Sequence, residues 1–422
     1  MTLLNNKAST IEELSEIQLQ KFKRIASYVK EHSKMYGELY KDVDFQINKL
    51  EDVKKLPFTT KQDVAVYKLD NRCVDFDNVV EVHTSSGTSQ KAIYTGFTHN
   101  DIEKSNEYLS EVWKMQGIKK DSVFLMLASY GLFSAGLINH YAIQKIGALV
   151  IPTGSTSLHK VIDVITELKP NSAAAVTSYY MYLIEQLKER GVQAGEIVID
   201  NLIAGGEPFT EQQRNFIEEF FSASLYAQYG LAEINTGIAG ECEAKNGMHI
   251  CADYVYPEII DPQTGNVLPD STEGELVLTT LDKETMPLVR YRTGDLTSIT
   301  YEQCSCGRMI PRIDYVRNRV GESIFYKGMT VDKNDVISIM ETLCSYVHPY
   351  TWCLEFTGDK LRQVVTMSVV LTKKADEQVA LVYVQKELIQ KLGFKVTVQV
   401  FPEAELTKQE SSKLKYLVDN RV

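Results

Sequence analysis

A run of hydroxyl-bearing and glycine residues ahead of a single cation is the segment of this chain best suited to phosphate chemistry. Residues 84–91 read Thr-Ser-Ser-Gly-Thr-Ser-Gln-Lys. Hydroxyls and main-chain N–H groups can wrap phosphate oxygens, glycine lets the main chain approach closely, and an ammonium offsets negative charge. A solvated turn is the alternative that this segment alone leaves open. The candidate phosphate ligands are Ser85, Ser86, Gly87, Thr88 and Lys91.

Strand-like residues flank this loop at 79–83 and 94–97, which predicts that it joins two strands as a hairpin. A Walker loop opens a helix with GxxxxGK[ST], and a dinucleotide loop carries GxGxxG after a strand. Neither spacing is present around residues 84–91. A phosphate site here would therefore use a different loop from those two.

Two segments at the carboxyl ends of predicted strands add candidate nucleotide contacts. Gly205, Gly206, Glu207 and Pro208 follow the strand 198–204, at the edge of a parallel sheet where ligands usually bind. An ordinary strand-to-helix turn is the alternative. The next strand, 224–227, leads into Tyr229, Gly230 and Glu233. Tyr229 could stack on a base, and Glu233 is a candidate Mg²⁺ ligand because that ion prefers oxygen.

Two further charged groups complete the candidate site. Asp295 lies in YRTGD (291–295), where we expect a tight turn whose carboxylate accepts hydrogen bonds from two ribose hydroxyls. Lys413 stands before a predicted short C-terminal helix, from which its charge could reach a neighbouring cleft. Taken alone, the first is typical of a structural turn and the second of a solvated lysine.

Three cysteines and one histidine have a spacing that suits a tetrahedral metal site. Cys242 and His249 lie seven residues apart, and Cys304 and Cys306 add two sulfur ligands from a distant loop. Such a Cys₃His set predicts a structural Zn²⁺ that pins two β loops together. Free thiols are the alternative, and Cys251 is the competing ligand. We expect the remaining cysteines to be packed, inert thiols: Cys73, Cys344 and Cys353.

The elements that must hold these groups alternate between strands and helices from residue 99 to 227, which predicts an α/β fold with a parallel sheet covered on both faces. Residues 11–41 have helical periodicity and predict one or two amphipathic helices. From about 238 the pattern becomes β-rich, and 320–422 reads as a small α+β unit.

The composition limits the partners. A net charge of −11 with scattered Lys and Arg argues against nucleic acid and against an anionic membrane surface. No apolar run approaches the roughly 20 residues that span a bilayer, and no export signal is recognised at the N-terminus. Seven unevenly placed cysteines fit a reducing compartment better than a disulfide framework, so we expect a cytoplasmic protein.

Together, these segments resemble the adenylate-forming superfamily, and most closely its phenylacetate–coenzyme A ligase branch. The resemblance covers nearly the whole chain and keeps the family's order. Its motifs include HTSSGTSQK (83–91), AGGEPFTEQQR (204–214), YGLAE (229–233), PLVRYRTGDLT (287–297), CSCGR (304–308) and SSKLKYLVDNR (411–421).

The resemblance implies a large N-terminal adenylation domain, 1–317, with a β-rich subdomain at about 238–317, and a mobile α+β domain at 318–422. It also implies a reaction in two steps. A carboxylate attacks the α-phosphate of ATP to give an acyl-adenylate and pyrophosphate, and a thiol then displaces AMP. Coenzyme A is the expected thiol and Mg²⁺ the expected ion, and we also consider a homodimer.

The resemblance assigns roles to the candidate residues. Ser85, Ser86, Gly87, Thr88 and Lys91 would hold phosphates, and Glu233 the Mg²⁺. Asp295 and Arg319 would bind the ribose, and Lys413 would contact the reacting oxygens. The adenine side would consist of Gly206, Glu207, Pro208, Tyr229 and Gly230. An aryl or arylacetic acid would be bound by Tyr130, Phe133, Gly205, Ile234 and Thr236, which could equally be core residues. Related ligases can carry the Cys₃His cluster.

Three departures from the family pattern limit this transfer of roles. Gln90 stands where relatives have glycine, and Ser412 replaces the glycine before the lysine. The hinge region reads Arg319-Val320-Gly321-Glu322, whereas relatives carry an acidic pair after the arginine. Two alternatives therefore stay open. The acyl group could pass to a carrier protein or an amine, or the chain could be a catalytically silent nucleotide-binding scaffold.

Overall fold

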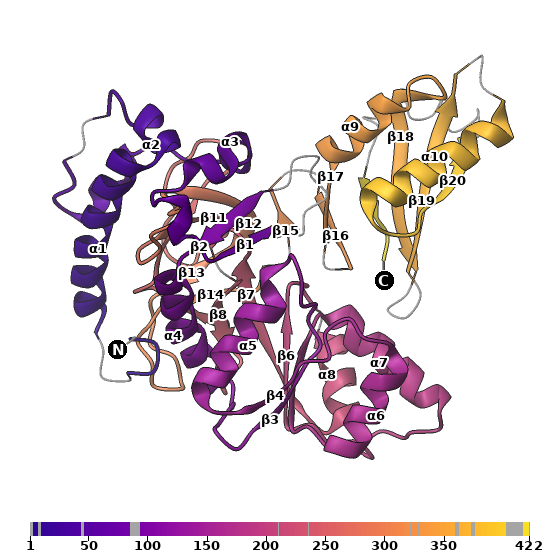
Figure 1. Cartoon of the computed structure of the whole chain (residues 1–422), viewed down its shortest axis with the longest axis horizontal. Coiled ribbons are helices and arrows are strands. Elements are labelled where there is room, and N and C mark those ends of the chain that lie inside the picture. The colour runs from indigo at the N-terminus through magenta and orange to yellow at the C-terminus, as the bar shows by residue number, and fades with distance from the viewer. Residues whose placement is uncertain are drawn as a thin grey trace. The chain divides into compact units, whose positions relative to one another are not determined.

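The computed structural model describes residues 3–6, 10–43, 46–84, 93–209, 211–234, 236–316, 318–320, 323–327, 329–358, 363–372, 376–401 and 417–421. These residues divide into two compact units, one ending at Val320 and the other following it (Figure 1). The functional domains expected at 1–317 and 318–422 remain a prediction.

A nine-stranded sheet organises the first unit. Its central strands are parallel, as predicted: β3 (Val123–Met126), β4 (Leu149–Ile151), β5 (Ser172–Ala175), β6 (Asn201–Gly205) and β7 (Ser224–Leu231). Four strands extend it antiparallel beyond β7, namely β8 (Thr236–Glu241), β9 (Met248–Ile250), β14 (Arg312–Ile313) and β13 (Ile299–Thr300). Strand β7 is longer than predicted and includes Tyr229 and Gly230.

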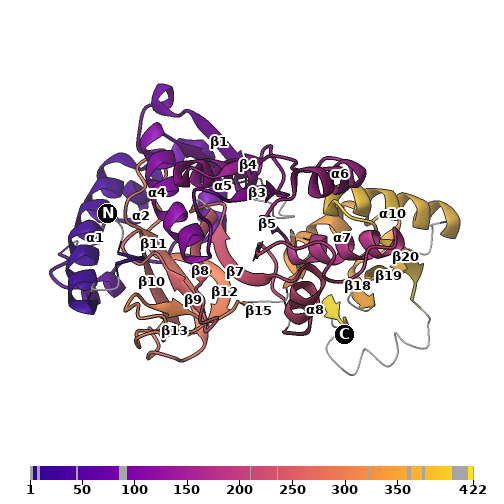
Figure 2. The same cartoon turned by 90° about the horizontal axis from the view of Figure 1, so that it is seen from below.

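Helices cover both faces of this sheet. Alternate residues of β3 point to opposite sides, so Phe124 packs with α4 (His99–Met115) and α5 (Ser134–Ile146). Leu125 faces a second core formed with α6 (Leu158–Leu168), α7 (Thr177–Glu189) and α8 (Glu211–Phe221). Figure 2 shows the strands between these two groups of helices. The predicted α/β fold is confirmed.

The strands expected in a separate β-rich subdomain divide between two sheets. Strands β8, β9, β13 and β14 join the large sheet, whereas a second sheet has the order β10 (Val255–Ile260), β11 (Gly274–Thr280), β12 (Tyr291–Thr297) and β15 (Asn318–Arg319). Since β8 returns beside β7 after only a short turn, it pairs with that strand and lengthens the existing sheet. The short pair β1 (Glu81–Thr84) and β2 (Tyr94–Phe97) is antiparallel, as the hairpin prediction requires.

The N-terminal helices cover the second sheet. Helix α1 (Ile11–His32) is followed by α2 (Lys34–Leu39), in agreement with the amphipathic pattern. The Phe22 ring meets that of Tyr256 on β10 edge to face at 5.7 Å, and the Gln18 amide donates to the Ala252 carbonyl at 2.8 Å. Shorter helices complete this region: η1 (Leu50–Lys55), α3 (Lys61–Tyr67), η2 (Lys68–Asn71) and η3 (Phe76–Asn78).

The second unit has its own core around a four-stranded sheet. Trp352 on β18 (Val347–Gly358) is fully buried among residues of β19 (Gln363–Leu371), α9 (Lys333–Thr342) and α10 (Glu377–Leu392). The sheet is completed by β20 (Thr397–Val400) and β21 (Leu417–Asp419), and β16 (Ser323–Tyr326) and β17 (Met329–Asp332) form a separate hairpin.

The predicted C-terminal helix is wrong at residues 417–419. These residues form β21, which lies parallel to β18 with Leu417 opposite Leu354. An apolar residue there packs against the unit's core, and the open edge of β18 supplies hydrogen-bond partners that an isolated short helix would lack. Of the helices described in either unit, none has the length and apolar character needed to cross a membrane.

Close packing of α4 on β8 gives a test of this architecture. A methyl group at Gly240 would lie 2.6 Å from Val112 Cγ1 and 2.8 Å from the Gln116 amide nitrogen. Gly240→Ala should therefore lower the free energy of unfolding by about 1–3 kcal/mol through overpacking. Denaturation followed by Trp113 fluorescence, in a Trp352→Phe background, measures this unit alone.

Gly131→Ala is the matched control, since nothing lies within 4 Å of a methyl group there. Equal stability of the two alanine variants would contradict the packing described for α4 and β8.

Candidate active site

A tyrosine and an arginine hold the carboxylate of Asp295 from two sides. The Tyr229 hydroxyl, on β7, donates to one oxygen at 2.7 Å, and the Arg319 guanidinium, on β15, lies 2.8 Å from the other. Asp295 and Arg319 are also direct partners in the pairing of β12 with β15. The structure therefore brings together three residues predicted for the nucleotide side.

The expected tight turn at Asp295 is wrong, because this residue lies within strand β12. The local irregularity is instead a shift of register opposite Glu275 and Val277, and Gly294 has a φ of 76°. Glycine adopts that conformation without strain, so the strand can bend and aim Asp295 toward β15. The main-chain N–H of Asp295 is bonded to the Thr293 hydroxyl at 3.0 Å.

The electrostatics around Asp295 suit recognition of neutral hydroxyls. Asp295 is only 5% exposed. Burial raises the pKa of its carboxyl group, and the Arg319 guanidinium acts to lower that pKa. Burial and the Asp295 carboxylate raise the pKa of Tyr229 well above its usual value, so the phenol stays a donor. A carboxylate fixed in this way can accept further hydrogen bonds from a diol.

Glu233 presents a carboxylate to which none of the described residues donates a hydrogen bond. It follows β7 in a turn closed by the Ile234 N–H and the Leu231 carbonyl at 3.1 Å, and it is 8% exposed. Its main-chain carbonyl accepts a hydrogen bond from Lys283 at 3.0 Å. Burial lowers the pKa of Lys283 to about 8, although the negative charges of Asp101 and Glu233 act to raise it. An unpartnered carboxylate has the donor chemistry that Mg²⁺ requires.

Glu207 accepts hydrogen bonds from the first turn of helix α7. Its carboxylate accepts hydrogen bonds from the Ser178 N–H at 2.8 Å and the Ser178 hydroxyl at 2.9 Å, in the first turn of α7. A carboxylate at a helix N-terminus satisfies free N–H groups and the helix dipole. Gly205 ends β6, and Gly206 has a φ of 77°, which makes a side chain at this turn unfavourable.

The predicted acyl-binding segment lies against the strand that leads into the predicted phosphate loop. The Thr84 N–H donates to the Leu132 carbonyl at 2.9 Å, and Phe133 is 44% exposed. The Tyr130 hydroxyl lies 2.9 Å from the Nδ1 atom of His140. Ile234 is fully buried in the core, so its side chain is not open to a ligand.

Several predicted residues lie outside the described part of the chain: Ser85, Ser86, Gly87, Thr88, Lys91 and Lys413. Pro208 is described without a polar contact of its own, since proline has no N–H. Thr236 begins β8, although its side chain is not described.

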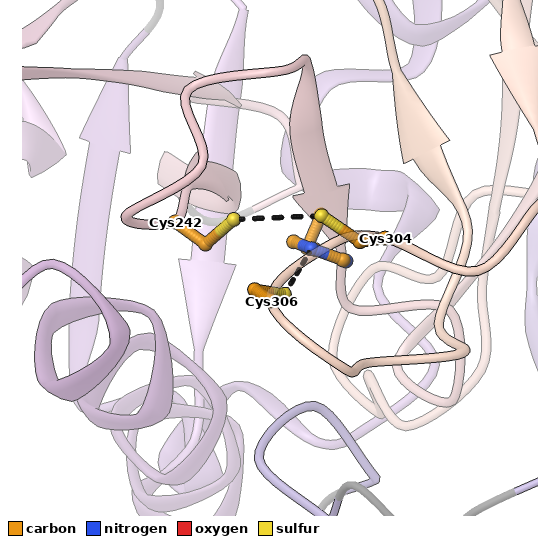
Figure 3. Close-up of side chains that lie close together, drawn as sticks. Cys242, Cys304 and Cys306 are labelled. Atoms are coloured by element: carbon orange, nitrogen blue, oxygen red, sulfur yellow. Dashed lines mark hydrogen bonds between the residues drawn. The ribbon is translucent and has the colours of Figure 1, made fainter.

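The four predicted metal ligands converge. One ligand atom from each of Cys242, His249, Cys304 and Cys306 lies within 4.8 Å of the other three, and all four residues are buried. The Cys242 and Cys304 sulfurs are 3.8 Å apart, and the Cys306 sulfur is 3.4 Å from His249 Nε2 (Figure 3). Ligands about 2.3 Å from a tetrahedral Zn²⁺ are separated by about 3.8 Å, so this spacing fits that ion.

The cluster is also prepared chemically for a metal. His249 Nδ1 lies 3.0 Å from the Ile310 carbonyl, which leaves Nε2 facing the thiols. Burial lowers the pKa of His249 to about 4, so its imidazole is neutral at neutral pH. Burial raises the pKa of the Cys242 thiol to about 12, because a thiolate is unfavourable in this buried place. A bound cation would stabilise the thiolate. Cys251 is buried elsewhere in the core, and Cys344 is exposed, contrary to prediction.

Known proteins with similar sequences identify the family. A family model described as AMP-binding enzyme matches residues 26–281. The phenylacetate–coenzyme A ligase of Thermus thermophilus is 30% identical over 432 residues, with 97% of each chain covered. The chain belongs to the AMP-binding enzyme family, in its phenylacetate–coenzyme A ligase branch. The resemblance found from motifs is thus confirmed.

A second relative supports the family, and a solved structure shows the fold. The Escherichia coli K12 phenylacetate–coenzyme A ligase is 33% identical over 335 residues, covering 77% of this chain and 75% of that enzyme. A crystal structure of 2-hydroxyisobutyryl-CoA ligase, in complex with 2-HIB-AMP and CoA, has a TM-score of 0.88 at 20% identity. It covers 97% of this chain and 90% of that one, and it shows the shared fold.

If Asp295 binds ribose in this AMP-binding enzyme, Asp295→Asn should weaken ATP binding at least tenfold. The amide keeps the side chain's shape and loses the charge-assisted hydrogen bonds, each worth about 1.5–3 kcal/mol. Calorimetric titration with ATP measures this effect, and circular dichroism reports the fold. Asp270→Asn changes an exposed aspartate and should leave the affinity as it is. An unchanged affinity in Asp295→Asn would refute the role.

If zinc occupies the cysteine cluster, freshly purified protein should contain about one equivalent of it. Cys304→Ser should lower both the zinc content and the thermal midpoint, because the metal stabilises only the folded loops. Metal analysis and thermal denaturation measure the two effects. Cys344→Ser, at an exposed thiol, is the control. Protein free of zinc with full stability would rule this site out.

Proposed function

We propose that this AMP-binding enzyme is an ATP-dependent, AMP-forming acid–coenzyme A ligase that activates an aryl or arylacetic carboxylate. The observation that carries the proposal is the buried Asp295, held by Tyr229 and Arg319, in a chain that belongs to the phenylacetate–coenzyme A ligase branch. The carboxylate of Glu233, which is close enough to raise the pKa of Asp295, adds a metal ligand of the right chemistry.

The reaction proceeds in two displacements. A carboxylate oxygen attacks the α-phosphorus of ATP, the bond to pyrophosphate breaks, and an acyl-adenylate forms. The sulfur of coenzyme A then attacks the acyl carbon, a thioester bond forms, and AMP leaves. The first step brings two anions together, so positioned cations and N–H donors must stabilise its transition state.

Each proposed residue contributes to that stabilisation or to alignment. Asp295 and Arg319 hold the ribose and so fix the α-phosphate relative to the acid. Lys413 supplies positive charge at the reacting oxygens, and the hydroxyls and N–H groups of residues 85–91 hold the outer phosphates. When bound by Glu233, Mg²⁺ would neutralise phosphate charge. The zinc we propose at the cysteine cluster has a structural role.

The acid is proposed to bind beside Tyr130 and Phe133, with Gly205 and Thr236 as neighbours. Aromatic side chains favour a flat, mostly apolar acid over a long aliphatic one. Names of the relatives support this class, since several are phenylacetate–coenzyme A ligases. A cytoplasmic location, a homodimeric state and the absence of nucleic-acid and membrane partners belong to the same proposal.

Pyrophosphate release with a panel of aryl, arylacetic and short aliphatic acids tests the function. Release that coenzyme A accelerates, with a thioester as product, is expected for the arylacetic acids. Release that only an amine or a carrier protein accelerates would indicate the alternative acceptor. Release with none of the acids would support the catalytically silent scaffold. That alternative stays open because Gln90 replaces a glycine in the predicted phosphate loop.

Lys413→Ala should reduce pyrophosphate release at least about 100-fold, because removal of one electrostatic stabiliser costs roughly that factor. Its effect on ATP affinity should be small, since the lysine acts at the transition state. Lys415→Ala removes an equal charge two residues away and should stay within a fewfold of the parent. Equal rates for the two variants would exclude Lys413 as the catalytic lysine.

A further inference from the structure

Among the described residues of the first unit, Lys283 is the largest charged side chain that is completely buried. None of the predicted roles uses it. It is 1% exposed, between β11 and β12. No described residue forms an ion pair with its ammonium group. Removing an unpaired ammonium from water costs several kcal/mol. An apolar side chain of similar length would avoid this cost, so stability alone does not account for a lysine here.

The contacts of Lys283 join two parts of the candidate site. Its ammonium donates to the Glu233 carbonyl at 3.0 Å and lies 4.6 Å from the centre of the Phe97 ring. Phe97 ends β2, the strand that follows the predicted phosphate loop. One buried cation therefore touches both the turn that carries the metal ligand and the strand that leaves the loop.

The main chain that follows Lys283 is fixed independently. Asp101, in the first turn of α4, accepts hydrogen bonds from the Glu284 N–H at 2.7 Å and the Thr285 N–H at 3.1 Å. The Asp101 carboxylate also bonds the Thr98 N–H, which begins that helix. The main chain after Lys283 is thus bonded to the N-terminus of α4, while the ammonium group of Lys283 donates to the Glu233 carbonyl.

We propose that Lys283 is a positioning residue for Glu233: it fixes the main chain of that turn and so aims the free carboxylate at the nucleotide's divalent cation. The inference rests on the proposed role of Glu233 as the Mg²⁺ ligand. Glu233 follows the end of β7, and the next residue, Ile234, is buried in the core. A single hydrogen bond to the carbonyl between these two fixed points restricts the backbone torsions on both sides of it.

Lys283→Met tests this role because methionine has a similar length, suits an apolar site and cannot donate a hydrogen bond. We expect the variant to fold and to need roughly tenfold more Mg²⁺ for half-maximal pyrophosphate release. Lys283→Arg keeps a donor and should recover part of the loss. Lys120→Met, at an exposed lysine, should match the parent.

A double-mutant cycle with Glu233→Gln separates positioning from general support of the fold. If Lys283 acts through Glu233, Lys283→Met should add little to the Mg²⁺ requirement once that carboxylate is gone. A full tenfold effect in the Glu233→Gln background would overturn the proposal, as would an unchanged Mg²⁺ requirement in Lys283→Met alone.

Two measurements keep the test decisive. If Lys283→Met does not fold, Lys283→Gln takes its place, because its donor is one bond shorter and reaches the carbonyl poorly; a raised Mg²⁺ requirement supports the role and an unchanged one overturns it. Calorimetric binding of ATP at low and high Mg²⁺ requires no turnover. It therefore tests Lys283 even if the parent protein is inactive toward every acid, a result that would count against the proposed function alone.

Discussion

The hydrogen bond between Tyr229 and Asp295 is the interaction on which the candidate site depends, because it joins the two larger sheets of the first unit. Tyr229 comes from β7 in the nine-stranded sheet, and Asp295 from β12 in the four-stranded one. At 2.7 Å, with one oxygen charged, it belongs to the stronger class of hydrogen bonds. Arg319 occupies the other carboxylate oxygen, so the edge strand β15 is held at the same point. A small shift of either sheet would separate the groups that we propose to bind one nucleotide.

The sequence predicts most of the large sheet because its signals there are local. Apolar strands and amphipathic helices alternate, and the parallel pairing follows from that alternation. The cysteine cluster is also found by spacing, since few residue types bind zinc. The tight turn expected at Asp295 is wrong. A glycine such as Gly294 fits either a tight turn or a bulge within a strand, and only the pairing with β15 distinguishes the two.

Long-range contacts account for what local patterns miss. Lys283 stands beside Asp282 and Glu284, a charged run that is typical of a solvated loop, yet the fold buries it. Its partners are fifty residues away at Glu233 and 186 residues away at Phe97. Residues 417–419 likewise form a strand because they pair with the edge of β18. The local sequence of that segment does not indicate that β18 is its partner.

Strand β21 has a consequence for the lysine that precedes it. Lys413 lies four residues before Leu417, and four extended residues span at most about 14 Å. Because β21 is paired with β18, the position of Leu417 is fixed within the second unit, and this length of chain is an upper limit on the separation of Lys413 from it. Substitutions that weaken the pairing of β21 with β18 would remove this limit and leave the contacts of Asp295 in the first unit unchanged.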